Sequence, residues 1–379
     1  MIRFLTIHII LFIYLLFRFV LPLKLSRPAK IGTFLLILLV SQHYLLRVLF
    51  RQMASPEAPR WLIMLEGWAS TTLIVIFLLI LVYDLYTLIR WLVNRRGSSL
   101  LPPVSFSPER RAVLFSLLAA GTAAYSLGKA VELPEIHSLE VVLPRLPKEL
   151  DGLTLVQLTD IHVSPLFPEQ WISGLADRVN SSRPDLILLT GDLVDGTPGL
   201  RANDIAPLAK MRSRYGIYGC VGNHEYYSGF RAWMPVFSSL GITMLHNSHA
   251  LLNIEGQQLA IAGVTDRVAR DFGLPLPSSA QALSILPENV PRIMLEHRPG
   301  AAAQNAASGV DLQLSGHTHG GHALGLNHLV GKFNEGFVYG KYTVDGMPLY
   351  VSSGAGLWNG FPVRLGVHSE IARIVLRAG

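Results

Sequence analysis

The hydrophobic pattern of the chain changes near residue 130. Before that point, apolar residues form long and nearly continuous runs of the roughly 20 residues that a membrane helix needs. Four such runs cover residues 4–23, 31–50, 68–93 and 112–127, of which the last is shorter and rich in small residues. We therefore predict an α-helical membrane region of about four spans within residues 1–129.

After residue 130 the apolar runs become short and end in polar or glycine-rich clusters. "LTLVQLTD", "DLILLTGD" and "VDLQLSGHTH" are examples, and such Val/Ile/Leu-rich runs are typical of strands buried on both faces. Amphipathic stretches of helical length, such as "PEQWISGLADRVNSS", separate several of them. This alternation predicts a layered α/β domain over residues 151–379, with functional loops at the carboxyl ends of its strands. The proline-spaced residues 130–150 are interpreted as a linker.

The positive charge of the chain belongs to the membrane region. Residues 1–129 contain 14 Lys and Arg against 4 Asp and Glu, whereas the remaining residues contain 18 against 22. A basic surface for nucleic acid is therefore not expected on the α/β domain. The predicted partners are a lipid bilayer and a phosphorylated small molecule or lipid.

Basic residues in short loops predict the orientation of the membrane region. The first loop contains Lys24, Arg27 and Lys30, and the third contains Arg90, Arg95, Arg96, Arg110 and Arg111. Such loops stay in the cytoplasm, so four spans place the α/β domain on the periplasmic face of a bacterial inner membrane. Loss of one span would reverse this result. Arg110 and Arg111 are either a twin-arginine export signal or a positive anchor at a helix start.

Residues suited to metal binding follow five of the predicted strands. They are Asp160 and His162, Asp192 and Asp195, Asn223 and His224, His297, and His317 and His319. Carboxylate, amide and imidazole groups suit Mn, Fe or Zn, and the single cysteine, Cys220, excludes a thiolate cluster. This many ligands could hold two divalent ions that share a carboxylate, clamp a phosphoryl group and activate a water molecule.

The order of these motifs resembles a known family. "DIH", "GDLVD", "GNHE", "LEHRP" and "GHTHGG" occur in that order, as in the calcineurin-like metallophosphoesterase superfamily, and the apolar N-terminal region is similar to its membrane-attached bacterial members. The resemblance covers about residues 150–375. It implies a four-layer α/β sandwich with two facing mixed sheets and two metal ions at their edge.

The resemblance also implies roles for individual residues. The first ion would be held by Asp160, His162, Asp192 and His319, and the second by Asp192, Asn223, His297 and His317. His224 would act as the catalytic histidine close to the substrate, oriented by Asp195. His322 stands where the family frequently has glutamine, and it is with Arg298 a candidate substrate contact.

Together these features predict a membrane-anchored dimetal phosphoesterase. It would hydrolyse a phosphodiester or pyrophosphate bond through a metal-bridging hydroxide, in an envelope lipid or a nucleotide-linked substrate. One alternative is a cytoplasmic UDP-2,3-diacylglucosamine pyrophosphohydrolase of lipid A synthesis. A second alternative is a non-catalytic, metal-bound membrane sensor.

Overall fold

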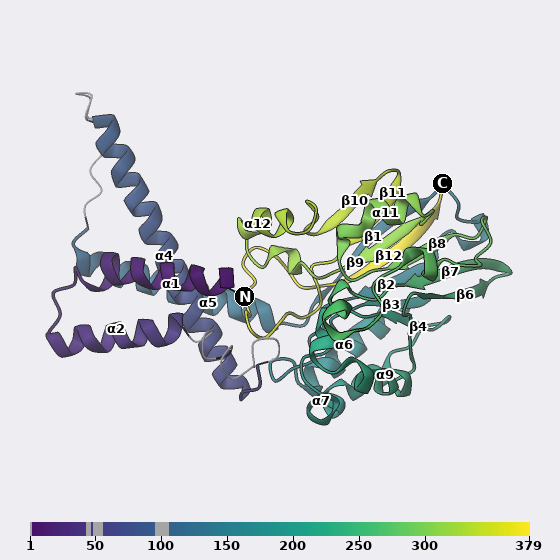
Figure 1. The fold of residues 1–379 in the computed structure, drawn as a ribbon, viewed down its shortest axis with the longest axis horizontal. Coiled ribbons are helices and arrows are strands. Elements are labelled where there is room, and N and C mark those ends of the chain that lie inside the picture. Colours follow the sequence, from purple (N-terminus) through teal and green to yellow (C-terminus); the bar gives the residue numbers. More distant parts are fainter. Residues whose placement is uncertain (1, 43–46, 48–55, 95–105) are drawn as a thin grey trace. The chain divides into compact units, whose positions relative to one another are not determined.

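The computed structural model describes residues 2–42, 47, 56–94 and 106–379 (Figure 1). The chain divides into two compact units. The first comprises Met1–Met53 and Arg60–Gly128, and the second comprises Ala54–Pro59 and Lys129–Gly379. Each unit is described by itself below.

The first unit is helical. Its elements are α1 (Ile2–Leu15), the π-helical turn η1 (Leu16–Val20), α2 (Arg27–Ser41), α4 (Arg60–Asn94) and α5 (Pro108–Val131). Among the described residues, α4 and α5 are the two helices that are long and apolar enough to cross a membrane, where about four spans were expected. The first expected span is divided between α1, of 14 residues, and η1, of 5 residues. Part of the second, residues 43–46 and 48–50, lies outside the described residues.

Charged side chains of the first unit are paired with one another. Asp84 accepts hydrogen bonds from Nε of Arg18 and from the hydroxyl of Tyr14, both at 2.7 Å. The buried Arg111 donates to the Arg18 carbonyl at 2.7 Å, and its guanidinium lies 5.2 Å from the ring centroid of Tyr83. Ion pairing of this kind offsets the cost of placing charge among apolar helices.

The second unit contains two mixed six-stranded sheets. The order in the first sheet is β1 (Glu135–Leu143), β12 (Glu370–Ala378), β2 (Thr154–Leu158), β3 (Leu186–Thr190), β4 (Ile217–Cys220) and β5 (Ile242–Met244). The order in the second sheet is β10 (Gly340–Val344), β11 (Met347–Val351), β9 (Leu312–Ser315), β8 (Arg292–Leu295), β7 (Gln257–Gly263) and β6 (Ser248–Ile254). In the first sheet β2 to β5 are parallel and β12 is antiparallel to β2.

The main hydrophobic core lies between the two sheets, because side chains of both, such as Leu155 and Leu188 of the first and Ile293 of the second, form one buried cluster. A second cluster joins the other face of the second sheet to α10 (Ser279–Ala282) and α11 (Ala302–Ala307). The helices α6 (Glu169–Ser181), α7 (Pro198–Ile205) and α9 (Phe230–Ser239) lie together beyond β3 and β4 (Figure 1). The structure therefore has the layered, mixed α/β architecture that the sequence predicted.

Short elements complete the second unit. They are η2 (Lys148–Leu150), η3 (Ala206–Lys210), α8 (Asn223–Tyr227), η4 (Arg267–Phe272), η5 (Pro299–Ala301), η6 (His319–Gly321) and α12 (Leu326–Lys332).

Residues 135–143, interpreted from the sequence as part of a linker, form the edge strand β1. It pairs in parallel with β12 from Glu135↔Glu370 to Leu143↔Ala378. Because one face of an edge strand remains solvated, its polar and apolar residues are mixed, and prolines on both sides made it resemble a linker. The unit therefore begins before β2, and its first strand follows α5 almost directly.

Candidate metal centre

The site lies where the carboxyl ends of strands from both sheets meet. Asp160 follows β2, Asp192 follows β3, and Asn223 follows β4 at the start of α8. His297 follows β8, and His317 follows β9. Because β2, β3 and β4 are parallel neighbours, their ends reach the same edge of the first sheet. The loops after β8 and β9 bring the histidines of the second sheet to it.

The backbone at this edge is unusual. Five of the predicted ligands have positive φ angles between 49° and 73°: Asp160, His162, Asp192, His317 and His319. Left-handed backbone in residues other than glycine costs on the order of 1–3 kcal/mol each. Glycine is required beside them, since a Cβ at Gly222 would lie 2.2 Å from Oδ1 of Asp192 and one at Gly316 would lie 2.3 Å from Oδ2 of Asp160. The rest of the fold therefore stabilises a strained backbone that directs these side chains towards one another.

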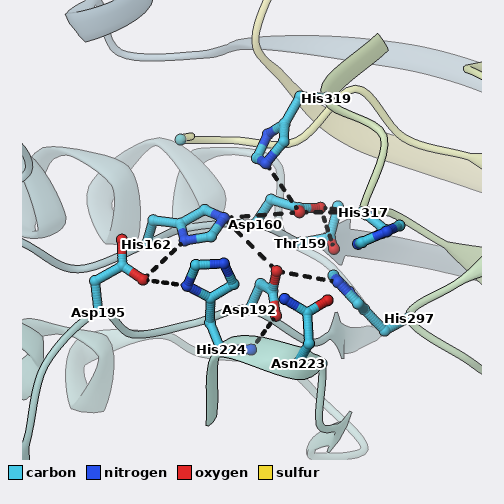
Figure 2. A network of polar contacts seen from close by, with 12 residues as sticks. Thr159, Asp160, His162, Asp192, Asp195, Asn223, His224, His297, His317 and His319 are labelled. Carbon is cyan, nitrogen blue, oxygen red and sulfur yellow. Dashed lines mark hydrogen bonds and ion pairs between the residues drawn. The ribbon is translucent and has the colours of Figure 1, made fainter. Parts of the chain in front are cut away.

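One group of ligand atoms is formed by Asp160, His162 and His319 (Figure 2). Oδ1 of Asp160 lies 3.5 Å from Nε2 of His319 and 3.8 Å from Nε2 of His162. The same nitrogen of His162 lies 3.8 Å from Oδ2 of Asp192. His162 therefore faces both carboxylates, as a ligand close to a shared aspartate would.

A second group is formed by Asp192, His297 and His317. Nε2 of His297 lies 3.1 Å from Oδ2 of Asp192. Its Nδ1 donates a hydrogen bond of 2.8 Å to the carbonyl oxygen of Thr190. Burial alone would raise the pKa of Asp192, but the facing His297, His224 and His162 hold it well below its ordinary value. Asp192 is thus an ionised carboxylate that belongs to the second group and faces His162 of the first.

The arrangement fits a divalent cation. Among the predicted ligands, three buried ring nitrogens make no hydrogen bond within the described part of the chain: Nε2 of His162, Nε2 of His297, which lies 3.1 Å from Oδ2 of Asp192, and Nδ1 of His319. A buried polar atom left in this way costs about 1–3 kcal/mol, and a bound cation would remove that cost at the first two. His162 and His297 each hold their other nitrogen against an acceptor, Asp195 or a backbone carbonyl, as metal-bound histidines do.

Asp195 connects two histidines of the site. Its Oδ1 lies 2.5 Å from Nδ1 of His224 and 3.2 Å from Nδ1 of His162 (Figure 2). Burial opposes ionisation of this carboxyl, but His162 and His224 lower its pKa to about 2. Asp195 is therefore a fixed negative charge behind both rings.

Arg298 contacts two of the residues predicted to hold the second ion. Its Nη2 donates to Oδ1 of Asn223 and its Nη1 to Nε2 of His317, both at 2.6 Å, and its Nε donates to Oδ2 of Asp266 at 2.7 Å. Burial and the Arg298 charge hold the pKa of His317 well below its ordinary value, so Nε2 accepts. A cavity of about 280 Å³ beside Arg298 is lined by Asp266 and Glu296, among others. Arg298 therefore lies between the ligand cluster and this cavity.

His322 lies behind His319. The ring centroids of His319 and His322 are 4.9 Å apart. The ring of Phe361 also packs against His322, with its centroid 5.4 Å away. Burial, together with the charge of Arg364, lowers the pKa of His322 to about 4, so the ring is neutral near pH 7. Its position supports the ring of His319.

The comparison with known proteins follows from this site. The model of the calcineurin-like phosphoesterase family matches residues 153–321. A zebrafish transmembrane protein with metallophosphoesterase domain is 32% identical over 328 residues, which cover 84% of this chain and 74% of that protein. This chain belongs to the calcineurin-like phosphoesterase family. The bovine protein of the same description is also 32% identical, over 77% of this chain and 68% of its own length. An uncharacterized metallophosphoesterase of Campylobacter jejuni is 36% identical, over 66% of each chain.

Family membership has two consequences. Calcineurin-like phosphoesterases are generally metal-dependent hydrolases of phosphate esters, which agrees with the clusters of His and Asp described above. The two long apolar helices and the relatives described as transmembrane proteins indicate membrane association. Since two of these relatives are vertebrate proteins, the combination is not restricted to bacteria.

The sequence interpretation assigned no role to Glu225 of this phosphoesterase. Its buried carboxylate accepts hydrogen bonds from the backbone N–H groups of Gly222 at 2.7 Å, Asp192 at 3.0 Å and Leu193 at 2.6 Å. Glu225 therefore joins the loop after β3 to the start of α8. Glu225 is the acidic residue of the motif "GNHE", so the motif pointed to it, but its hydrogen-bond partners could not be identified without the fold.

Proposed function

We propose that this chain is a membrane-anchored phosphoesterase that binds two divalent ions, Mn, Fe or Zn, and hydrolyses a phosphodiester or pyrophosphate bond. The observation that carries the proposal is the position of Asp192, which forms one ligand group with His297 and His317 and lies 3.8 Å from Nε2 of His162 in the other group. In this proposal the first ion is held by Asp160, His162, Asp192 and His319. The second is held by Asp192, Asn223, His297 and His317.

The residues around the ions would donate the proton to the leaving group and bind the phosphate. When bound, divalent ions polarise phosphoryl oxygens and lower the pKa of water. His224 is partly exposed, with 11% of its side chain accessible, and its Nδ1 contacts Asp195. His224 would donate a proton to the leaving oxygen. Arg298 would turn from Asn223 and His317 towards a phosphate oxygen, while Asp266 holds its Nε.

A short segment before α4 supports the proposed topology. Within the second unit, Glu57 forms an ion pair with Arg201, and the carbonyl of Pro56 accepts a hydrogen bond of 2.9 Å from Asn359. Segments that pack together lie on the same side of a membrane. This segment precedes α4 and the domain follows α5, so the contacts require both helices to cross, or neither.

The basic residues then indicate which side this is. Arg95, Arg96 and Arg110 lie between the two spans, and such positions favour the cytoplasm. The catalytic unit would lie on the opposite, periplasmic face of a bacterial inner membrane. This argument no longer depends on whether α1 and α2 also cross.

The reaction is tested with the full-length protein in nanodiscs. After removal of metal and reconstitution with Mn, Fe or Zn, the wild type should hydrolyse bis-p-nitrophenyl phosphate. Asp192→Asn should lose bound metal and reduce kcat by about 100-fold or more, whereas Asp177→Asn, at an exposed position of α6, should retain both. A wild type inactive with every metal would contradict the enzymatic proposal and favour the metal-bound sensor.

The side of the membrane and the substrate need separate experiments. A reporter fused to the C-terminus should be active outside the cytoplasm. Product analysis after incubation with envelope lipid extracts would then identify the substrate. A cytoplasmic reporter together with hydrolysis of UDP-2,3-diacylglucosamine would instead favour the lipid A alternative.

A further inference from the structure

The segment that follows the "GHTHGGH" loop exposes large apolar side chains. Five of them are between 40% and 71% exposed within sixteen residues: Leu324, Leu326, Leu329, Phe333 and Tyr339. Leu326 and Leu329 lie three residues apart on α12, and its C-cap residue Phe333 follows four residues later, so the three lie on one helical face. We call these five residues the α12 patch. Clustered exposure of this kind marks a contact surface, whereas single exposed apolar residues are ordinary.

The α12 patch lies beside the point where the chain enters the catalytic unit. Tyr339 lines the same cavity as Glu135, Ile136 and His137, the first residues of β1. A Cβ at Gly366, which also lines this cavity, would lie 2.5 Å from Cδ1 of Leu324, so Leu324 packs directly there. Both ends of the patch are therefore close to the start of β1.

The start of β1 is in turn close to a predicted membrane span. The span α5 ends at Val131 and β1 begins at Glu135. The connecting residues are held on the domain, since Trp171 donates to the Val131 carbonyl at 3.0 Å and Arg178 to the Pro134 carbonyl at 2.9 Å. An extended chain of this length reaches only about 13 Å. If α5 crosses a bilayer, the short connection keeps the end of that span near the start of β1.

The patch also adjoins the metal centre. His319 and Leu326 are separated by a tight loop, in which a Cβ at Gly321 would lie 2.5 Å from Cα of Asn327 on α12. The N–H of Leu365 donates to the His322 carbonyl, and that of Leu324 donates to the Leu365 carbonyl, both at 3.0 Å. The loop that carries two predicted ligands is thus continuous with the patch.

We propose that the α12 patch rests in the headgroup region of the same bilayer that α5 crosses, so that the metal centre opens at the membrane surface. The partner is the phospholipid bilayer. Tethering by α5 makes the contact intramolecular, so a small apolar surface suffices. The exposed Lys332 lies within the patch and the exposed Lys341 follows it, and ammonium groups suit phosphate headgroups. This inference rests on the proposed membrane attachment and is independent of the proposed reaction.

The test uses spin labels on the full-length protein in nanodiscs of phosphatidylethanolamine and phosphatidylglycerol. Cysteine replaces Leu329 in the patch, Leu251 on β6 as an exposed control, or Leu78 on α4 as a bilayer reference. Accessibility to oxygen and to a water-soluble nickel chelate is measured for each label. The proposal expects labels at Leu329 and Leu78 to favour oxygen and the label at Leu251 to favour nickel.

Other outcomes separate the two ideas. A nickel-accessible label at Leu329 with a lipid-exposed label at Leu78 would overturn the inference alone. Nickel access at both positions would contradict membrane attachment by α4 as well. Protection of Leu329 from both reagents would mean that protein, such as a second copy of the chain, covers the patch, and this too would overturn the inference.

A second variant tests whether the apolar face causes the contact. Leu326→Ser, Leu329→Ser and Phe333→Ser are combined in a chain labelled at Leu324→Cys. The label should move from lipid to water exposure, while hydrolysis of the soluble diester stays unchanged. A label that keeps its lipid exposure would overturn the role of these three residues.

Discussion

Oδ1 of Asp195 lies 2.5 Å from Nδ1 of His224, so the carboxylate and the ring form one unit at the mouth of the site. The pKa of Asp195, lowered to about 2, keeps this carboxylate ionised at every working pH. This contact holds the His224 ring in one orientation. The pair therefore has the geometry of an acid and its positioning residue.

Asp195→Asn removes that charge with little change in shape. We expect kcat for an alkyl phosphodiester to fall by about 100-fold, since its leaving oxygen requires a proton. The p-nitrophenyl diester should be affected much less, because p-nitrophenolate leaves without one. Steady-state kinetics with both substrates measure the difference. Equal losses would indicate that Asp195 acts through His162 or the fold instead of through proton donation.

Arg298→Gln removes a positive charge that lies beside Asn223 and His317, two predicted ligands of the second ion. The guanidinium lies 2.6 Å from both Oδ1 of Asn223 and Nε2 of His317, and a cation there opposes binding of another. We expect the second ion to bind the variant about tenfold more tightly than the wild type. A tenfold change in affinity corresponds to a modest part of the Coulomb repulsion between the guanidinium and a cation at this distance. Calorimetric titration of the metal-free protein measures this affinity.

The matched control for this change is Arg267→Gln, an exposed arginine of the same cavity. It should leave both metal affinities unchanged. Weaker binding of the second ion in Arg298→Gln would contradict the prediction. Arg298 would then be needed to orient Asn223 and His317.

Glu225→Gln should destabilise the catalytic unit. The carboxylate accepts three backbone hydrogen bonds in a buried position, and an amide must direct an N–H at one of those donors. We expect a loss of about 2–4 kcal/mol in the free energy of unfolding, as for buried hydrogen bonds to charged groups. Thermal unfolding and metal content should both fall. Glu288→Gln, at an exposed position, serves as the control and should change neither.

Cys220 should be unreactive in the folded protein. It is fully buried, and burial together with the charges of Glu296 and Glu225 raises its pKa well above the ordinary value of 9.0. A raised pKa keeps a thiol neutral to higher pH, so the reactive thiolate is not formed at pH 8 or 9. Ellman's reagent should detect no thiol before denaturation and one afterwards. Rapid labelling of the native protein would contradict the burial of β4.

Hydropathy alone located the two longest helices; about four spans were expected, and α4 and α5 are the two of sufficient length among the described residues. Hydropathy does not report where a helix ends, and Leu16–Val20 form a π-helical turn after α1. The strand β1 was missed for a related reason. Its partner strand β12 lies at the other end of the chain, so the sequence around β1 contains no pattern that predicts their pairing.

By itself the sequence determined the types of candidate ligand, their order and the family, because donor chemistry and buried strands are properties of short segments. Only the tertiary structure decided that Asp195 holds His224, that Arg298 lies on Asn223 and His317, and that the α12 patch adjoins β1. These contacts join segments far apart in the chain, and the packing of two sheets brings them together.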